Sequence, residues 1–267
     1  MRAGATTDAW LTRVKTDAAS VFTSLRRLIT FRSVKRPAYG TENMNAHQRV
    51  PTFNEKVAEV LKTVTYRVAR TEGDRDAIFG LRYRGYLLDG GIGPNARERF
   101  QDPWDDAANA VVMGMYFGDR LASTVRFHMN NAPDARMPAM DTFGDALEPY
   151  LAEGKLIIDP TRFVIEPEFA RMGPDLPFLT LRMISMAAEY FGAAYVLATV
   201  RSEHVVMYRR VIGHKPISEP RTYPMLSRKI VCMITDIDTL RATAYVRHPF
   251  LQSTPEERAA IFGAAKS

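Results

Sequence analysis

The stretch from Lys155 to His214 constrains the fold more than any other part of the chain. It begins with an apolar segment and a turn rich in Pro, Gly and Arg. An amphipathic helix follows, then a second apolar segment without charge, and a short helix that ends at Gly213. Two apolar strands joined by a helix form a βαβ unit, which pairs its strands in parallel through a right-handed connection. The sequence therefore predicts a sheet with a parallel pair at its centre.

Patterns on both sides of this unit predict antiparallel strands and further helices. Residues 64–70 alternate apolar and polar side chains, as a strand does, and Asp74 is placed to cap a helix. Residues 110–129 hold two apolar runs separated by a Gly-Asp pair that suits a hairpin turn. Further strands and helix starts are expected at RTYPML, RKIVCMITDI, Asp238 and Thr254. The predicted class is α/β (α+β), with a mixed central sheet and helices on both faces.

The N-terminal segment carries the whole excess of positive charge. Residues 1–62 hold eleven of the 36 basic and five of the 30 acidic residues, so the remaining 25 of each kind cancel. Apolar residues at helical spacing between Asp8 and Ile29 predict an amphipathic helix with a basic character. Such a helix can lie on an anionic membrane, contact an acidic protein or dock on the main domain. We therefore divide the chain into a basic helical extension with a linker, 1–62, and a main domain, 63–267.

Composition and motifs argue against several classes of protein. The longest uncharged stretch, 107–118, is too short to cross a bilayer as a helix, and no secretory signal is recognisable. The five histidines lack the spacing of a zinc site, and no GxSxG elbow or Walker loop occurs. The neutral main domain gives nucleic-acid binding no electrostatic support. We expect a cytoplasmic protein, peripheral to the membrane if its extension binds lipid, with no metal and no resident cofactor.

Five segments carry a more specific signal, and they occur in a fixed order. FGLRYRGYLL is rich in arginine and aromatic residues, and QDPWDD contains Asp102 and Asp105. The run GDRLASTVRF ends a hairpin and includes Arg126. IDPTRFVIEPEFAR places Asp159 three residues before Arg162, which Phe163 follows. SEHVVMYRRVIGH carries Tyr208 shortly before Gly213.

In this order the segments resemble the GNAT superfamily of N-acyltransferases, and within it the long-chain N-acyl amino acid synthases and acyl-homoserine-lactone synthases. The resemblance covers about Tyr66 to Leu226. It implies a GNAT fold, in which neighbouring parallel strands of the central sheet splay apart. It also implies transfer of an acyl group from a thioester to an amine.

The chain departs from the family pattern at four places. Asp159 stands where these synthases usually have Glu, and His214 stands where an aromatic residue is usual. The pyrophosphate loop survives only as Arg171-Met172-Gly173-Pro174, and the proline removes an amide donor from it. This change favours a carrier-protein thioester over coenzyme A. The first-helix region lacks the tryptophan that lactone synthases usually have, which weakens the lactone interpretation.

The resemblance implies a role for each candidate residue. Amide formation from a thioester needs a placed neutral amine, a stabilised oxyanion and a proton for the leaving thiolate. Tyr208 would supply that proton, with His204 stacked one turn earlier, whereas the structural alternative is that Tyr208 only packs under the sheet. The remaining candidates are Asp102 and Asp105 for the substrate ammonium and Phe163, Val164, Arg171 and Gly173 for the acyl and pantetheine groups.

The roles of Asp159 and Arg162 depend on the local geometry of their strand. Residues three apart on a regular strand face opposite sides, so a bulge near Pro160 is needed to bring the two side chains together. One would then orient the substrate ammonium and the other its carboxylate, with Arg126 as a second carboxylate partner. An internal salt bridge that holds the hairpin to the central strand is the alternative.

The expected function is therefore transfer of a long-chain fatty acyl group from acyl carrier protein, or from acyl-CoA, to the α-amine of an amino acid. Two alternatives stay open: a homoserine-lactone synthase that uses S-adenosylmethionine, and a non-catalytic acyl- or lipid-binding module. The expected partners are the carrier protein, the amino acid and, through the N-terminal helix, a membrane surface. Methionines of the sheet region fit either a flexible acyl tunnel or ordinary core filling.

Overall fold

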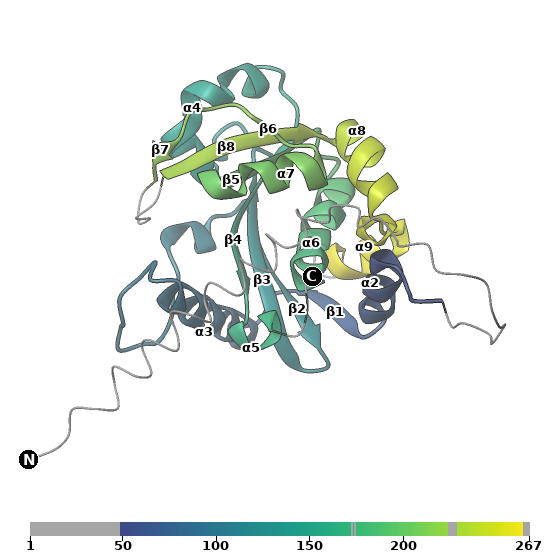
Figure 1. The fold of residues 1–267 in the computed structure, drawn as a ribbon. Helices are drawn as coiled ribbons and strands as arrows, with labels where there is room; N and C mark the ends of the chain where they lie inside the picture. The colour runs from purple at the N-terminus through teal and green to yellow at the C-terminus, as the bar shows by residue number, and fades with distance from the viewer. Residues whose placement is uncertain (1–48, 172, 174, 224–228, 264–267) are drawn as a thin grey trace, which may run out of the picture.

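The computed structural model describes residues 49–171, 173, 175–223 and 229–263 (Figure 1). The amphipathic helix expected between Asp8 and Ile29 lies outside these residues. The strands are β1 (Val64–Val68), β2 (Ala110–Phe117), β3 (Arg120–Met129), β4 (Ile157–Ile165), β5 (Tyr195–Arg201), β6 (Lys215–Pro216), β7 (Arg221–Thr222) and β8 (Lys229–Asp236). The α-helices are α2 (Phe53–Leu61), α3 (Glu72–Leu88), α4 (Pro138–Leu151), α5 (Pro167–Ala170), α6 (Leu176–Phe191), α7 (Val205–Ile212), α8 (Ile237–Leu240) and α9 (Pro255–Phe262). Shorter turns are η1 (Pro103–Asp106), η2 (Ser202–His204), η3 (Arg241–Tyr245) and η4 (Pro249–Leu251).

One mixed sheet organises the described residues, in the order β1-β2-β3-β4-β5-β8-β6, with β7 also paired to β8. All neighbours are antiparallel except β4 and β5, which are parallel. The predicted central parallel pair and the hairpin at Ala110–Met129 are both confirmed. In Figure 1 the strands β1 to β4 run in a clearly different direction from β5 and β8. The sheet therefore consists of two halves joined at β4 and β5.

Helices cover both faces of the sheet, as the sequence predicts. On one face, α4 packs on side chains that include Leu197 of β5 and Cys232 of β8. On the other face, α6 packs on β3 and β4, and α7 lies over Ala198 and Val200 of β5. Because successive strand residues point to opposite faces, β5 contributes side chains to both layers. The single cysteine, Cys232, is fully buried.

Local sequence signals explain where several elements begin and end. Thr71 and Asp74 form a reciprocal capping box at the start of α3. Gly213 ends α7 with φ 85°, a left-handed conformation that glycine adopts without steric cost. Thr254 caps α9, as predicted. The predicted cap at Asp238 is wrong: Asp236 begins α8, because its carboxylate accepts the Thr239 amide at 2.7 Å.

Two peripheral segments are held against the core. Helix α2, which lies inside the predicted extension, buries Val57 and sets the Phe53 ring 5.1 Å from that of Phe178. At the other end of the described chain, Arg182 forms an ion pair with Glu257 at 2.6 Å and donates to the backbone carbonyls of Phe250 in η4 and of Gln252 just after it. These contacts cover the outer surface of α6.

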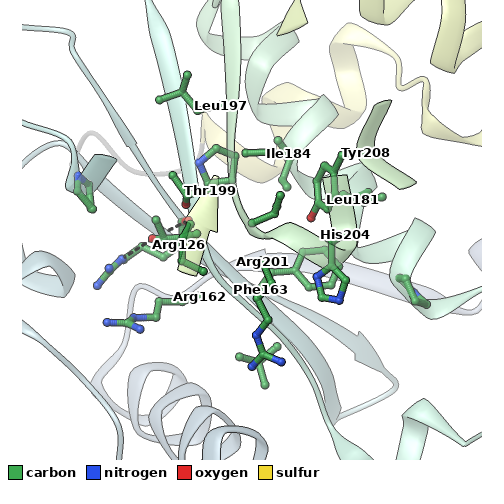
Figure 2. Close-up of a pocket in the computed structure, with 18 of the residues that line it drawn as sticks. Arg126, Arg162, Phe163, Leu181, Ile184, Leu197, Thr199, Arg201, His204 and Tyr208 are labelled. Carbon is green, nitrogen blue, oxygen red and sulfur yellow. Dashed lines mark hydrogen bonds between the residues drawn. The ribbon is translucent and has the colours of Figure 1, made fainter. Parts of the chain in front are cut away.

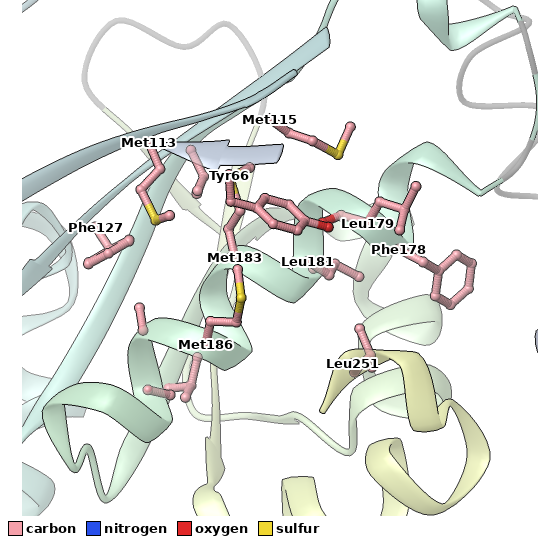
Figure 3. Close-up of a cluster of buried hydrophobic side chains, with 14 of the residues drawn as sticks. Tyr66, Met113, Met115, Phe127, Phe178, Leu179, Leu181, Met183, Met186 and Leu251 are labelled. Carbon is pink, nitrogen blue, oxygen red and sulfur yellow. The ribbon is translucent and has the colours of Figure 1, made fainter. Parts of the chain in front are cut away.

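Methionines of strand β2 and helix α6 fill the main core (Figure 3). Met113, Met115, Met183 and Met186 are fully buried in one cluster with Tyr66 and Phe127. The methionines expected to line a tunnel or fill the core are Met113, Met115, Met129, Met183, Met186 and Met207. Among them, only Met207 contributes to the pocket described below. Core filling is therefore the role that the structure supports for the others.

Candidate active site between two parting strands

The two parallel strands separate soon after they meet. Strands β4 and β5 pair at two positions, Ile157 with Tyr195 and Ile158 with Val196. Beyond these pairs, residues 159–165 and 197–201 run on without pairing to each other. The strand edges that face this gap therefore present backbone donors and acceptors to whatever enters it. The splayed geometry expected from the resemblance is thus present.

A β-bulge shapes the β4 side of the gap. Thr124 pairs with Val164 and Arg126 with Thr161, so two β4 residues, Arg162 and Phe163, lie opposite one β3 residue. Arg162 has φ 55°, a left-handed conformation that costs a non-glycine residue on the order of 1–3 kcal/mol. The bulge was expected near Pro160. It occurs later because Pro160 keeps its regular pairing with Phe127.

The bulged strand also approaches helix α3 closely. A Cβ atom at Gly85 of α3 would collide with Cγ1 of Val164. Glycine at this position therefore lets the helix contact the strand at the bulge. Gly85, Phe163 and Val164 all line the same pocket, as the resemblance implies for the two β4 residues.

The pocket has a volume of about 460 Å³ and passes through the gap from one face of the sheet to the other. We call the side toward α3 and α4 the polar branch; it is lined by Asp102, Trp104, Arg126, Asp141, Arg162 and Tyr223. We call the side toward α6 and α7 the apolar branch; it is lined by Leu181, Ile184, Met207, Ile212, Leu240 and Leu251. Figure 2 shows Arg126 and Arg162 on one side of the gap and Leu181, Ile184 and Tyr208 on the other.

Asp102 organises the charges of the polar branch. One of its oxygens accepts Nη1 of Arg126 at 2.6 Å and the Trp104 amide at 3.0 Å. Its other oxygen accepts Nε of Arg162 at 3.1 Å and also Nη2 of that residue. These arginines hold the pKa of Asp102 at about 2, although burial opposes the shift. Asp102 therefore holds both arginines that were predicted to bind the substrate.

Asp105 extends this network away from the pocket. Its carboxylate lies 2.6 Å from Nη1 of the fully buried Arg82 and 3.0 Å from Nη1 of Arg126, and it accepts the Asp102 amide. Asp105 is 3% exposed and does not line the pocket. Three guanidinium groups thus face two carboxylates, which leaves one positive charge unmatched within the network. The structure contains the salt bridge that was the alternative to substrate binding, but with Asp102 in place of Asp159.

Arg162 is the most accessible member of this network. Its guanidinium lies 4.7 Å from the centre of the Phe100 ring, and Nη1 is 3.4 Å from the Tyr86 hydroxyl. Its side chain is 14% exposed, against 1% for Arg126. The left-handed backbone of the bulge directs this side chain to the same face as Arg126.

Asp159 is fully buried behind the polar branch and does not itself line the pocket. One carboxylate oxygen accepts the Ala139 amide at 2.8 Å, and the other has no hydrogen-bond partner among the described residues. Burial raises the pKa of Asp159 to about 7. Its catalytic role stays a prediction, and no direct contact with Arg162 supports their predicted pairing.

Tyr208 lies on the apolar branch, where α7 covers the gap. Its side chain is half-buried, and burial raises the pKa of the phenol to about 12, so the hydroxyl keeps its proton at neutral pH. The ring of His214 packs edge-on against that of Tyr208 at 5.6 Å. The expected stacking of His204 on Tyr208 stays a prediction. His204 lines the pocket as well.

Arg171 and Gly173 lie outside the lining of this pocket. Arg171 is exposed, and a Cβ at Gly173 would approach an oxygen of Asp175. Asp175 occupies the N-cap of α6 without a side-chain capping bond, and Pro177 in the first turn lacks an amide hydrogen. A negative side chain and missing donors make this helix start a poor cradle for a pyrophosphate.

Sequence reasoning missed several residues of the pocket. Trp104 and Tyr223 line the polar branch, and Asp89 at the end of α3 forms an ion pair with Arg201 at the end of β5. Both members of that pair line the pocket. The QDPWDD segment marked the vicinity of Trp104, but nothing in the sequence indicates which segments the splayed strands bring together.

In the described parts of the chain, no helix is both long enough and apolar enough to cross a membrane. The His, Cys, Asp and Glu side chains of the same residues form no group that could hold a metal ion.

Comparisons with known proteins agree with this geometry. Among solved structures, the chain is similar to FeeM, an N-acyl amino acid synthase from uncultured soil microbes, with a TM-score of 0.59 and 16% identity over 69% of this chain and 96% of that one. It is also similar to the CoA-dependent acyl-homoserine lactone synthase BjaI, with a TM-score of 0.51 and 16% identity over 73% and 98% of the two chains. The chain is similar to TofI as well, with a TM-score of 0.52 and 16% identity over 71% of this chain and 100% of that one. At these identities the likenesses show a shared GNAT-like fold.

No curated protein sequence matches the chain significantly. The family model described as "N-acyl amino acid synthase FeeM" matches residues 77–236, which include the bulge, the gap and the network around Asp102. This match covers more than half of the 267 residues. The protein is therefore an acyltransferase that belongs to the FeeM family of N-acyl amino acid synthases.

Proposed function

We propose that the protein transfers a long-chain fatty acyl group from acyl carrier protein to the α-amine of an amino acid. The observation that carries the proposal is the pocket that passes through the gap between β4 and β5. One branch is apolar and suits a fatty chain, and the other is charged and suits an amino acid. The family is known from its sequence match, whereas the donor and the acceptor are inferred from the site.

The thioester would lie along the gap. The pantetheine arm contains amides that can pair with the free backbone edges of β4 and β5, as an added strand would. The bulge at Arg162 and Phe163 frees backbone amides from regular pairing with β3, and one of them would stabilise the oxyanion. The fatty chain would then pass Tyr208 into the apolar branch beside Leu181 and Ile184.

The amino acid would occupy the polar branch. The unmatched positive charge of the network around Asp102 favours a carboxylate, and Arg162 is its most accessible donor. Arg126 keeps Asp102 in place, and its own Nε donates to Thr161 at 3.1 Å. The α-amine of an acceptor held in this way would face the thioester carbon from the polar side of the gap.

The amine nitrogen loses two protons during the reaction, and the leaving sulfur gains one. The substrate ammonium first loses a proton, and the neutral nitrogen then attacks the thioester carbon to form the C–N bond. The C–S bond breaks as Tyr208 protonates the departing thiolate, and the phenolate then regains a proton by way of solvent, which takes up the second proton of the nitrogen. Asp159, whose pKa is about 7, is the proposed acceptor of the amine proton through the groups that separate it from the pocket.

The start of α6 favours a donor with one phosphate over coenzyme A. Asp175 and Pro177 weaken the site where a pyrophosphate would bind, and acyl carrier protein presents only pantetheine and a single phosphate. Carrier proteins are acidic, and the exposed Arg209 and Arg210 on α7 lie on the helix that covers the gap. We therefore propose the carrier protein as the partner that delivers the acyl group.

The proposal is tested with purified protein, a long-chain acyl carrier protein, the matching acyl-CoA and a panel of the standard amino acids. Release of free thiol together with an N-acyl amino acid in the mass spectrum is the expected result, with faster turnover from the carrier protein. Lactone formation that depends on S-adenosylmethionine would replace the proposal with the lactone-synthase alternative. Acyl binding without thiol release for any amine would overturn it.

A further inference from the structure

The apolar branch contains one polar group that its surroundings leave unsatisfied. His214 follows Gly213 at the end of α7, is 3% exposed and lines the pocket. Neither of its ring nitrogens has a hydrogen-bond partner among the described residues. The backbone carbonyls of Leu197 and Val196 lie close enough to the ring to act against the lowering of its pKa, but neither reaches hydrogen-bond geometry with a ring nitrogen.

Burial holds this ring in its neutral form. The pKa of His214 is lowered to about 4, so at neutral pH the imidazole offers one donor and one acceptor nitrogen. Leaving a buried polar atom unpaired costs free energy of folding, because the atom gives up its hydrogen bonds to water. Phenylalanine would avoid this cost while keeping the edge-on packing against Tyr208. A hydrogen-bonding group on the ligand would explain why the cost is tolerated.

The position of His214 limits which part of the ligand it can meet. Its ring contacts that of Tyr208, the proposed proton donor to the sulfur, and it lies near the point where β4 and β5 part. Ile212 and Leu240, which line the same branch, surround this point with hydrocarbon. A polar group on the acyl chain a few bonds beyond the thioester carbon would therefore reach the imidazole.

We propose that the apolar branch selects acyl groups that carry a hydroxyl at C3, and that His214 is the residue that recognises it. A hydroxyl both donates and accepts, so it can pair with either nitrogen whichever tautomer is present, whereas a 3-oxo group can only accept. The inference rests on the proposed function, because it assigns the apolar branch to the acyl chain. It adds the chemical class of that chain.

The test uses unreactive thioether analogues of acyl-pantetheine, so that it reads binding without requiring turnover. Three long-chain analogues of equal length are compared by calorimetry: unsubstituted, 3-hydroxy and 3-oxo. Wild-type protein should bind the 3-hydroxy analogue about tenfold more tightly than the unsubstituted one. In the His214→Phe variant the two affinities should become nearly equal, with the unsubstituted analogue bound at least as well as by wild type.

His248→Phe is the matched control. His248 is a half-buried histidine in an aromatic cluster with Phe178 and Phe250, outside the lining of the pocket. This variant should keep the wild-type preference. Equal binding of the 3-hydroxy and unsubstituted analogues by wild type, a preference for the 3-oxo analogue, or an unchanged preference in His214→Phe would overturn the inference.

The same analogues separate this inference from the proposed function. If no acyl donor supports transfer but the 3-hydroxy preference is present and depends on His214, the catalytic proposal fails and the recognition proposal stands. If transfer proceeds equally well from hydroxylated and unsubstituted donors and the analogues bind equally, the recognition proposal fails and the catalytic one stands.

Discussion

The two branches of the pocket treat polar groups in opposite ways. In the polar branch, the carboxylate of Asp102 is bound by two arginines and a backbone amide. In the apolar branch, both nitrogens of His214 lack partners among the described residues. The polar branch is thus assembled before any ligand arrives, whereas the apolar branch contains a polar group that only a ligand or solvent can satisfy.

This difference indicates that the polar branch selects the acceptor and the apolar branch selects the acyl donor by different means. A network of paired charges holds its arginines in fixed positions, so the acceptor is selected by the shape and the small charge excess of a preformed site. An unpaired imidazole among apolar side chains discriminates through a single hydrogen bond. Substitutions in the polar branch should therefore affect folding as well as turnover, and those in the apolar branch should mainly change the preference for donors.

The largest effect is expected from Tyr208→Phe. Loss of the phenolic proton donor should slow turnover by about 10²–10⁴-fold, the usual contribution of a general acid, while acyl-analogue binding stays near that of wild type. Steady-state kinetics and calorimetry measure the two quantities. Tyr190→Phe, at an exposed position on α6, is the control and should leave both unchanged. Unaltered turnover in Tyr208→Phe would remove this residue from the mechanism.

The next effect tests the preassembly of the polar branch. Asp102→Ala leaves Arg126 and Arg162 without their shared partner and should lower the free energy of unfolding by about 3–5 kcal/mol. Urea denaturation measures this change. Asp145→Asn removes one partner of the exposed pair with Arg221 and should have little effect. Similar stability of the two variants would show that the network does not support the fold.

A smaller effect should sharpen the assignment of the apolar branch. Ile184→Trp places a larger side chain in the proposed path of the acyl chain and should reduce kcat/KM for long-chain donors by about tenfold or more, with short-chain donors affected less. Ile261→Trp on α9, outside the pocket lining, is the control. An equal loss for long and short donors would mean that the chain does not lie beside Ile184.

The smallest effect concerns the pH dependence of stability. The pKa of Asp159 rises from 3.8 to about 7 on folding, so the folded state holds a proton that the unfolded state releases between these values. Stability from this group is therefore greatest below pH 4 and falls as pH rises toward 7. Asp102, whose pKa falls to about 2, acts in the opposite sense and contributes stability that is lost as pH falls below 4.

Unfolding measured from pH 5.5 to pH 8 should separate these two carboxylates. The comparison is the difference in the free energy of unfolding between wild type and Asp159→Asn, in which the shared contributions of the histidines cancel. This difference should move against wild type as pH rises from 5.5 to 8, a range in which Asp102 is ionised in both states. A difference that stays constant across this range would show that Asp159 does not hold a proton in the folded state.

Local patterns explain how much of this architecture was predictable. The hairpin, the βαβ unit and the cap at Thr254 depend on nearby residues, and the sequence predicts their positions well. Asp74 was predicted to cap α3, but Thr71 is the N-cap and Asp74 completes the capping box from the third position of the helix. The cap of α8 was assigned two residues too late, because Asp236 and Asp238 are both acceptable caps and tertiary packing decides between them. The position of the bulge was missed for a related reason, since it depends on how β4 registers with β3.

The site was predictable only in part because its contacts are long-range. The sequence indicated Arg126, Arg162 and Asp102 as a group, and the structure brings them together from β3, the bulge and the start of η1. It could not indicate that Asp102 pairs with both arginines, or that Asp159 lies behind the pocket wall. His214 was noted as an unusual residue at an aromatic position, but its missing hydrogen bonds become apparent only when its neighbours are known.

The central claim is that a fatty thioester lies in the gap between β4 and β5, with its chain on the side of α6 and α7. A crystal structure of the complex with an unreactive acyl-pantetheine thioether tests this most directly. The account predicts pantetheine amides hydrogen-bonded to the strand edges beyond Ile158 and Val196, with the sulfur near Tyr208 and the chain beside Ile184. A bound analogue on the outside of the sheet, with β4 and β5 closed onto each other, would contradict it.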